Sequence, residues 1–259
     1  MRSILWIAVG VVWGAACALA QGNYEVQVYA SEPTAKGATM VELHSNFTAR
    51  GYRYVQDGVL PTNHAEHETV EITHGWNEWF ETGFYIFTSI QPDGSWEYVG
   101  SHIRPRVSIP ERYHVPVGLS LSMEFGYQRP NISLDTWTWG IRPIIDKKLG
   151  RWYGSFNPTF GKSFHGPGRS DGFVFEPNAK VSYDVTKRVA MGLEYYGSVG
   201  SLLSVAPFRD QEHVFLPAVD LDFGKRWEFN FGVGVGTTQA TDHLLIKMIL
   251  GYRFGGTTD

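Results

Sequence analysis

The feature that most constrains this chain is a period-two alternation of apolar and small or polar residues, sustained over long stretches. In residues 115–127 every odd position is apolar or aromatic, whereas the even positions hold Pro, Gly, Ser and Glu. Residues 227–236 and 244–254 alternate in the same way. Successive side chains of a β-strand point to opposite faces, so this pattern predicts strands with one apolar face.

Twelve such strands are predicted, most of about 10–13 residues, which is longer than the roughly 5–6 residues typical of soluble proteins. They span residues 40–49, 67–74, 79–90, 97–109, 115–127, 134–146, 151–164, 172–185, 188–199, 212–223, 227–236 and 244–254. Short connections alternate with longer loops such as residues 51–66 and 201–211. Short turns at one end and longer loops at the other are typical of membrane-spanning antiparallel barrels.

We therefore predict an all-β fold over residues 39–254: a 12-stranded antiparallel transmembrane β-barrel with short periplasmic turns and longer extracellular loops. A soluble sandwich also alternates, but its solvated face would carry more Lys and Glu than these Gly- and Ser-rich faces do. The apolar faces are long enough to cross the hydrocarbon layer at a tilt. Aromatic residues beside the short turns, such as Trp76, Trp79 and Trp227, predict the girdles of a membrane barrel.

The N-terminus predicts secretion. Residues 1–20 combine an early Arg2, an apolar run and Ala18-Leu19-Ala20, which fits a signal peptide cleaved after Ala20. A lipoprotein cut before Cys17 is the alternative, although Gly14 stands where a bulky aliphatic residue is usual. Residues 21–38, whose first part also alternates, are predicted to form a periplasmic or lumen-contacting extension, and residues 255–259 a C-terminal tail.

Composition excludes other classes of protein. With 43% hydrophobic, 15% aromatic and only 19% charged residues, the chain is too apolar to be disordered. The net charge of −4 offers no basic surface for nucleic acid. The one cysteine, Cys17, leaves with the signal peptide, which suits a bacterial envelope better than a disulfide-linked secreted domain. No cofactor motif is evident: Gly232, Gly234 and Gly236 alternate on a strand without a following helix.

Two segments carry a resemblance to a known family. They are ETVEITHGWNEWFETGFYIF, residues 68–87, and the final strand LLIKMILGYRF, which ends at Phe254. The chain resembles bacterial outer-membrane β-barrels, including porin-like transporters of the meta-pathway phenol-degradation type. This resemblance implies a Gram-negative outer-membrane location, passive transport and insertion through the barrel-assembly machinery by the C-terminal strand. It implies no catalytic residues.

Assigning the apolar face to lipid places the charged residues inside the barrel, because Arg or Lys facing lipid at mid-depth costs about 2–4 kcal/mol. We predict an acidic group beside a basic pair, and two interpretations remain open. One is an internal salt-bridge network that fills the barrel, and the other is a polar constriction that selects solutes by charge. The lumen candidates are Glu42, His44, Glu71, Glu81, Arg104, Arg106, Glu124 and Arg142.

Two further groups of residues have catalytic or metal-binding chemistry. His102 facing Ser120 across a hairpin, with Glu124 on the same face, would be a possible nucleophile, base and orienting group. No nucleophile motif surrounds them, so no catalytic site is predicted. A loop cluster with metal-binding chemistry, His64, Glu66, His67 and Glu68, is expected to be solvated rather than metal-bound.

The predicted function is passage of small solutes, otherwise unidentified, through the polar lumen of an outer-membrane barrel that is not an enzyme and contacts lipid. The alternatives are a structural or adhesive barrel with a filled lumen and, third, a lipid-modifying enzyme.

Overall fold

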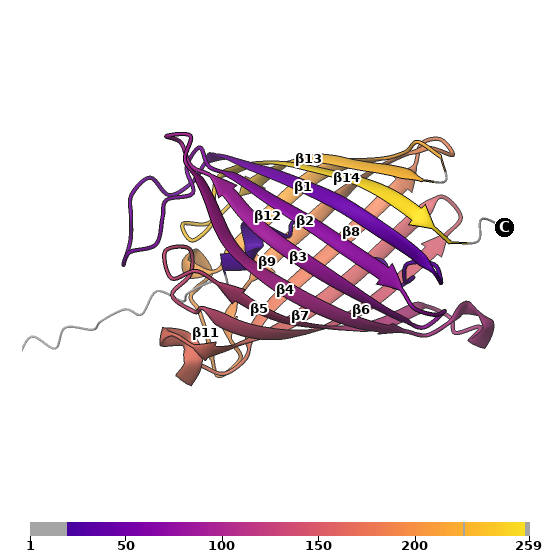
Figure 1. Cartoon of the computed structure of the whole chain (residues 1–259), viewed down its shortest axis with the longest axis horizontal. Helices are drawn as coiled ribbons and strands as arrows, with labels where there is room; N and C mark the ends of the chain where they lie inside the picture. Colours follow the sequence, from indigo (N-terminus) through magenta and orange to yellow (C-terminus); the bar gives the residue numbers. More distant parts are fainter. Residues whose placement is uncertain (1–19, 225, 257–259) are drawn as a thin grey trace, which may run out of the picture.

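A computed structural model describes residues 20–224 and 226–256, so the predicted signal peptide lies almost entirely outside the described residues. The chain forms a closed antiparallel barrel of twelve strands, in which β14 pairs with β1 (Figure 1). The strands are β1 (Ala38–Arg50), β2 (Glu66–Gly75), β3 (Phe80–Ile90), β4 (Trp96–Ser108), β5 (Gly118–Gln128), β6 (Trp137–Leu149), β7 (Trp152–His165), β8 (Val174–Asp184), β9 (Val189–Ser198), β12 (Glu212–Asp222), β13 (Trp227–Gly236) and β14 (Leu244–Gly255). The predicted fold class is therefore confirmed.

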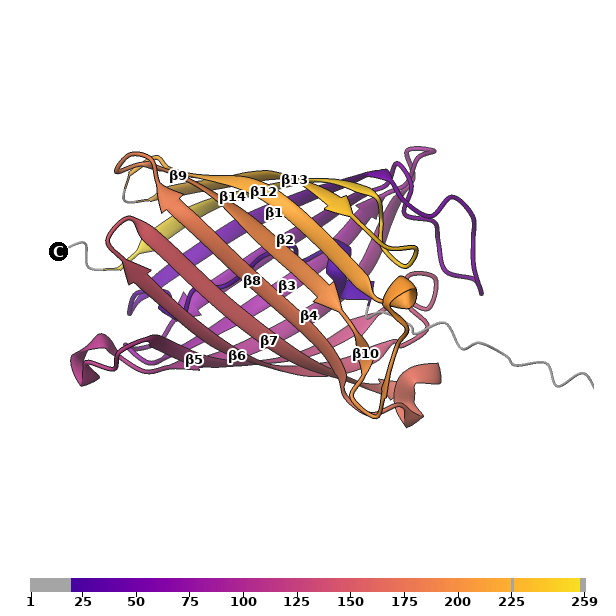
Figure 2. The same ribbon diagram turned by 180° about the vertical axis from the view of Figure 1, so that it is seen from behind.

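The connections divide the barrel into a short-turn end and a long-loop end (Figures 1 and 2). The long-loop end holds residues 51–65 and the excursion between β9 and β12, which contains the two-residue strands β10 (Gly200–Ser201) and β11 (Ser204–Val205). Two strands differ from the sequence prediction by three residues: β5 at its start, and β6, which spans Trp137–Leu149 instead of residues 134–146, at both ends. Strand β5 begins at Gly118 rather than residue 115, because the short helix η2 (Glu111–Tyr113) makes residues 109–117 a longer loop.

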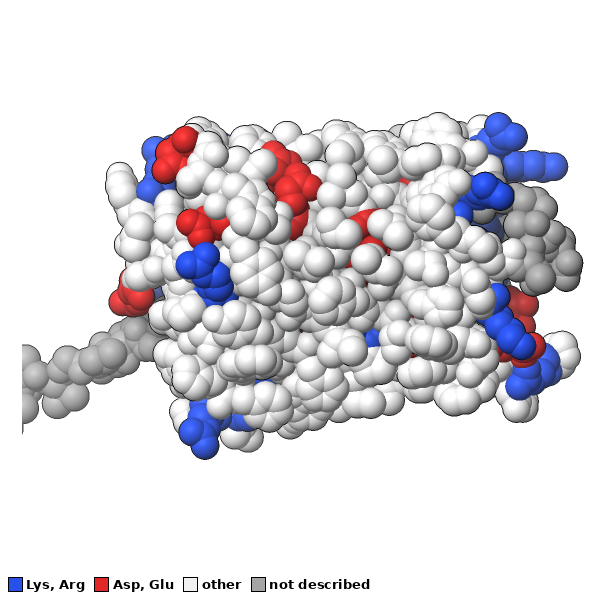
Figure 3. All heavy atoms as spheres, in the orientation of Figure 1, with Lys and Arg blue, Asp and Glu red and all other residues white. Residues whose placement is uncertain are grey.

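The outer wall is apolar. Outward side chains such as Leu43, Ile72 and Phe125 are 38–43% exposed along the middles of their strands. Figure 3 shows most Lys and Arg side chains toward the two ends, and the surface between the ends is largely uncharged apart from a few acidic side chains. Monomeric soluble proteins rarely expose an apolar surface of this extent. Aromatic side chains at the short-turn end, including Trp79, Trp152 and Trp227, fit the interfacial girdle of a membrane barrel.

A charge placed on this wall tests its contact with lipid. Met123, at the centre of β5, is 38% exposed on the outer face. We expect Met123→Arg to lower the free energy of unfolding in bilayers by about 2–4 kcal/mol, the cost of Arg at the membrane midplane. Leu149→Arg, at the end of β6, is the control and is expected to cost only about 0–1 kcal/mol. Equal costs at the two positions in urea unfolding would contradict a lipid-facing wall.

The interior contains the N-terminal extension. Its described part begins with the short helix η1 (Ala20–Asn23) at the long-loop end, and residues 24–37 pass through the barrel to Ala38, where β1 begins at the short-turn end (Figure 2). Residues 24–34 take no part in the pairings of the sheet. Among the described residues, no helix is long and apolar enough to cross a membrane.

Candidate functional site

The structure places all eight lumen candidates on the inner wall of the barrel, over the neighbouring strands β1 to β6. Each side chain belongs to a residue that is at most 9% exposed. Glu42 and His44 lie on β1, Glu71 on β2, Glu81 on β3, Arg104 and Arg106 on β4, Glu124 on β5 and Arg142 on β6. The residues fall into two ion-pair groups.

The first group surrounds two arginines of β4. Arg104 binds the carboxylates of Glu71, at 2.7 Å, and Glu81, at 3.2 Å, while Arg106 binds Glu81 at 2.8 Å. Glu81 and Arg106 are direct register partners across β3 and β4. Gly83 permits this arrangement, since a Cβ atom there would lie 3.1 Å from the Arg104 guanidinium. Buried charges are tolerated when they are paired and hydrogen-bonded, as they are here.

Register decides which residues meet in this group. Directly opposite Glu71 is Glu42, whereas His44 lies opposite Thr69 and reaches Glu71 at 3.4 Å. Glu71 is not opposite Glu81, because its partner on β3 is Tyr85. The two carboxylates belong to one group because Arg104 bridges them.

The second group centres on Arg142. Its guanidinium binds Glu25 of the N-terminal segment at 2.9 Å and Glu124 at 3.3 Å, and Nδ1 of His102 lies 3.0 Å from Glu124. Gly126 faces the His102 ring, which would lie 1.8 Å from a Cβ atom at that position. Arg142 therefore links the barrel wall to the N-terminal segment by charge.

Tyr29 of the N-terminal segment joins the two groups. Its hydroxyl donates to Glu25 at 2.6 Å and lies 3.2 Å from the hydroxyl of Tyr85. Its ring is contacted by the guanidinium carbons of Arg104 and Arg142, at 4.8 and 4.9 Å from the ring centroid. Both distances are within the range of a cation–π interaction.

A third ion-pair group lies across the lumen on β8, β9, β12 and β14. Lys247 binds Glu194 at 2.6 Å, and Lys180 binds both Glu194 and Asp220. Tyr196 donates a hydrogen bond to Glu194 at 2.6 Å. All four residues lie on the inner wall of the barrel.

Polar side chains of the wall bind the main chain of residues 23–34. Asn157 accepts the Tyr29 amide at 2.7 Å and, with Ser155, donates to the Tyr29 carbonyl. Arg106 donates to the carbonyls of Ala30 and Glu32. Four further contacts join Asn46 to Asn23, Thr69 to Tyr24, Asp146 to Ser31 and Glu81 to Thr34. These contacts satisfy main-chain groups that have no sheet partner.

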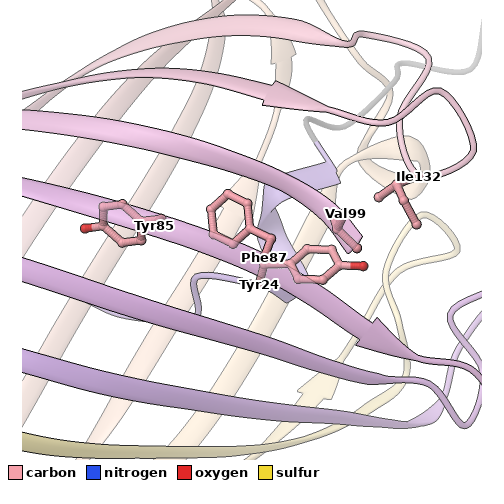
Figure 4. Close-up of a cluster of buried hydrophobic side chains, with 5 residues drawn as sticks. All are labelled: Tyr24, Tyr85, Phe87, Val99 and Ile132. Carbon is pink, nitrogen blue, oxygen red and sulfur yellow. The ribbon is translucent and has the colours of Figure 1, made fainter. Parts of the chain in front are cut away.

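Two small apolar clusters also hold the segment. Tyr24 belongs to a cluster with Tyr85, Phe87, Val99 and Ile132, in which the Phe87 ring lies between those of Tyr24 and Tyr85 (Figure 4). In the second cluster, Val26 packs against Leu216, Ala218 and Leu245. The inward apolar residues of β3, β12 and β14 thus have partners inside the lumen.

Two cavities remain beside the segment. One of about 790 Å³ occupies the short-turn half, where the described lining residues include equal numbers of basic and acidic side chains. The other, of about 250 Å³, lies at the long-loop end and is lined by Glu176, Glu212 and Asp242 among others. The boundary between the two cavities falls within the N-terminal segment, since Val26 lines the small cavity and Gln27 lines the large one.

The residues with metal-binding chemistry are arranged differently from the sequence hypothesis. His67 is buried inside and contacts Thr48, whereas Glu68 lies on the outer face and accepts from Ser45. These two loop-cluster residues therefore cannot share an ion. Ligand atoms of Glu42, His44 and Glu71 do lie within 4.8 Å of one another, although Arg104 already neutralises Glu71.

The hypothetical nucleophile and base do not meet. His102 is the register partner of Gly126, whereas Ser120 lies opposite Ser108. Glu124 binds His102 but also Arg142. The hypothesis that His102 faces Ser120 is therefore wrong, because the residue opposite His102 is Gly126, three inward-facing residues further along β5.

Sequence reasoning missed Glu25, Tyr29 and Tyr85. Tyr85 lies four residues after Glu81 on β3, so the alternation of the strand places both side chains on the inner face, and Tyr85 was predictable as an inward residue. Leu245 and Ile249 lie on the same face of β14 as Lys247 and therefore point inward. Apolar side chains inside a polar lumen need a partner, so these two residues were a signal that a further segment occupies the lumen. Glu25 and Tyr29 precede the barrel, and no periodicity relates them to the wall.

No protein-family model and no curated protein matches this chain. Solved structures do match. The KdgM porin aligns with a TM-score of 0.53 at 8% identity, covering 83% of this chain and 99% of that one. The NanC porin aligns with a TM-score of 0.54 at 8% identity and the same coverage. LpxR from Salmonella typhimurium aligns with a TM-score of 0.43 at 6% identity, covering 82% of this chain and 99% of that one.

The likeness to the two porins shows that the chain has the fold of an outer-membrane β-barrel. This fold and the apolar outer wall place the protein in the bacterial outer membrane.

Proposed function

We propose that this outer-membrane barrel is a passive channel for small polar solutes and that its N-terminal segment controls the opening. The observation that carries the proposal is the division of the lumen. Cavities of about 790 and 250 Å³ reach toward opposite ends, and the boundary between them lies at Val26 and Gln27 rather than at a wall strand.

The balanced charge of the large cavity bears on the solute. Its basic and acidic side chains are interleaved, as in the contacts of Lys180 with Glu194 and Asp220. A wall of this kind offers hydrogen bonds of both polarities and no strong preference for one sign of charge. We propose that the solutes are small, polar and near neutral overall. The names of the similar porins support a channel.

Single-channel recording in planar bilayers tests the proposal, with a pair of neighbouring substitutions. Ala190 on β9 lines the large cavity, whereas Met191 points outward and is 57% exposed. We expect Ala190→Trp to lower the conductance at least about twofold by narrowing the lumen. Met191→Trp places the same side chain against lipid and is expected to leave the conductance unchanged. A protein that passes no current with or without its N-terminal segment would contradict the channel.

A further inference from the structure

We infer that the inner wall of the barrel is a binding site for oligopeptides, and that residues 23–34 occupy it as an intramolecular ligand. The inference deepens the proposed function and rests on it, because it names peptides as the solute class of the channel. Three features of the contact carry it: recognition of main chain, two side-chain subsites, and independence of the bound segment from the sheet.

The wall recognises peptide main chain through side chains. Proteins often bind an extended peptide by adding it to the edge of a sheet, but a closed barrel has no free edge. Here Asn157 and Ser155 hold both the amide and the carbonyl of Tyr29, and Arg106 binds two further carbonyls. Main-chain groups are present in every peptide, so these contacts do not require this particular sequence.

Two subsites add selectivity. Arg142 binds the carboxylate of Glu25, and Arg104 and Arg142 contact the ring of Tyr29, whose hydroxyl also meets Tyr85. A buried arginine favours a carboxylate, and paired guanidinium groups favour an aromatic ring. The preferred ligand is therefore a peptide with a carboxylate and a phenol four residues apart.

The occupant is separable from the barrel. Residues 24–34 contribute no strand pairing, and the sheet closes between β1 and β14 without them. Residues 35–37 that join the segment to β1 are exposed at the short-turn end. Departure of the segment would therefore leave the backbone hydrogen bonds of the barrel intact and expose the wall contacts to another peptide.

The test uses the assembled full chain with a specific protease site inserted between Lys36 and Gly37. After cleavage and washing, binding of fluorescent synthetic peptides is measured by anisotropy in detergent. The first peptide has the sequence of residues 21–36. The second keeps only Glu25 and Tyr29 and has Ala or Ser elsewhere, and the third differs from the first only by Glu25→Gln and Tyr29→Ala.

We expect the first two peptides to bind one per barrel, the second more weakly than the first because it lacks the apolar contacts of Tyr24 and Val26. The third is expected to bind at least about tenfold more weakly than the first. Equal binding of the third peptide, or failure of the second to bind, would overturn the inference. If the cleaved segment stays in the lumen, the binding assay is repeated with a chain that lacks residues 21–35. Absence of peptide binding to both the cleaved chain and the shortened chain would also overturn the inference.

The assay separates the two proposals. A barrel that conducts ions but binds none of the peptides removes the peptide site and leaves the channel standing. Peptide binding by a barrel that passes no current keeps the binding site and removes the channel.

Discussion

Deletion of residues 21–35 is expected to raise the single-channel conductance several-fold. The segment crosses the lumen between the two cavities, and its removal joins them into one water-filled path. The barrel itself is expected to persist, because its strand pairings do not involve these residues. Electrostatic loss is limited, since Arg104, Arg106 and Arg142 each keep a carboxylate of the wall.

Recording in planar bilayers checks this expectation. The matched control replaces residues 53–57 of the long loop with Gly and Ser, a change of similar kind outside both cavity linings. The control is expected to conduct as the unaltered protein does. If the variant that lacks residues 21–35 still resists unfolding in detergent but shows no increase in conductance, the barrel wall and not the N-terminal segment limits the passage of ions.

Loss of Arg104 is expected to destabilise the barrel and to change its ion selectivity. Arg104 is 2% exposed and pairs with Glu71 and Glu81, so Arg104→Gln leaves two carboxylates with less compensation. Removing one partner from a buried ion pair costs about 3–5 kcal/mol. The added negative charge in the lumen is also expected to favour cations over anions.

Both effects have direct measurements. Urea unfolding followed by tryptophan fluorescence gives the stability, and reversal potentials in a salt gradient give the selectivity. Arg129→Gln is the control, because Arg129 pairs with Glu97 near the surface, where an ion pair contributes at most about 1 kcal/mol. Unchanged selectivity in the charge reversal Arg104→Glu would contradict a role of this group in the constriction and favour an internal network that only fills space.

The strands were predictable because a membrane imposes a simple rule on each of them. Lipid on one side and a polar interior on the other give a period of two, which the pattern of residues 115–127 shows directly. The start of β5 was misplaced by three residues, since Val115 and Val117 continue the alternation into a loop. Alternation does not distinguish the last residues of a strand from an apolar loop beside it.

The sequence predicted which charged residues face the lumen, but it did not predict which of them contact one another. Parity places Glu71, Glu81 and Arg104 inside, yet the pairing depends on register, and a shift of two residues preserves parity while changing every neighbour. Glu42 thus faces Glu71, and Arg104 rather than a hairpin turn brings Glu71 and Glu81 into one group.

The sequence by itself determined that this chain is a barrel with an apolar outside and a charged inside, because the side-chain period of a strand is local and each strand carries it independently. Only the tertiary structure decided that residues 22–37 pass through that interior. Tyr29 meets Tyr85, Arg104 and Arg142 across separations of 56 to 113 residues, and these contacts exist only once the strands have closed around the segment. Whether the lumen is open or occupied is therefore a property of the closed barrel and of no single strand.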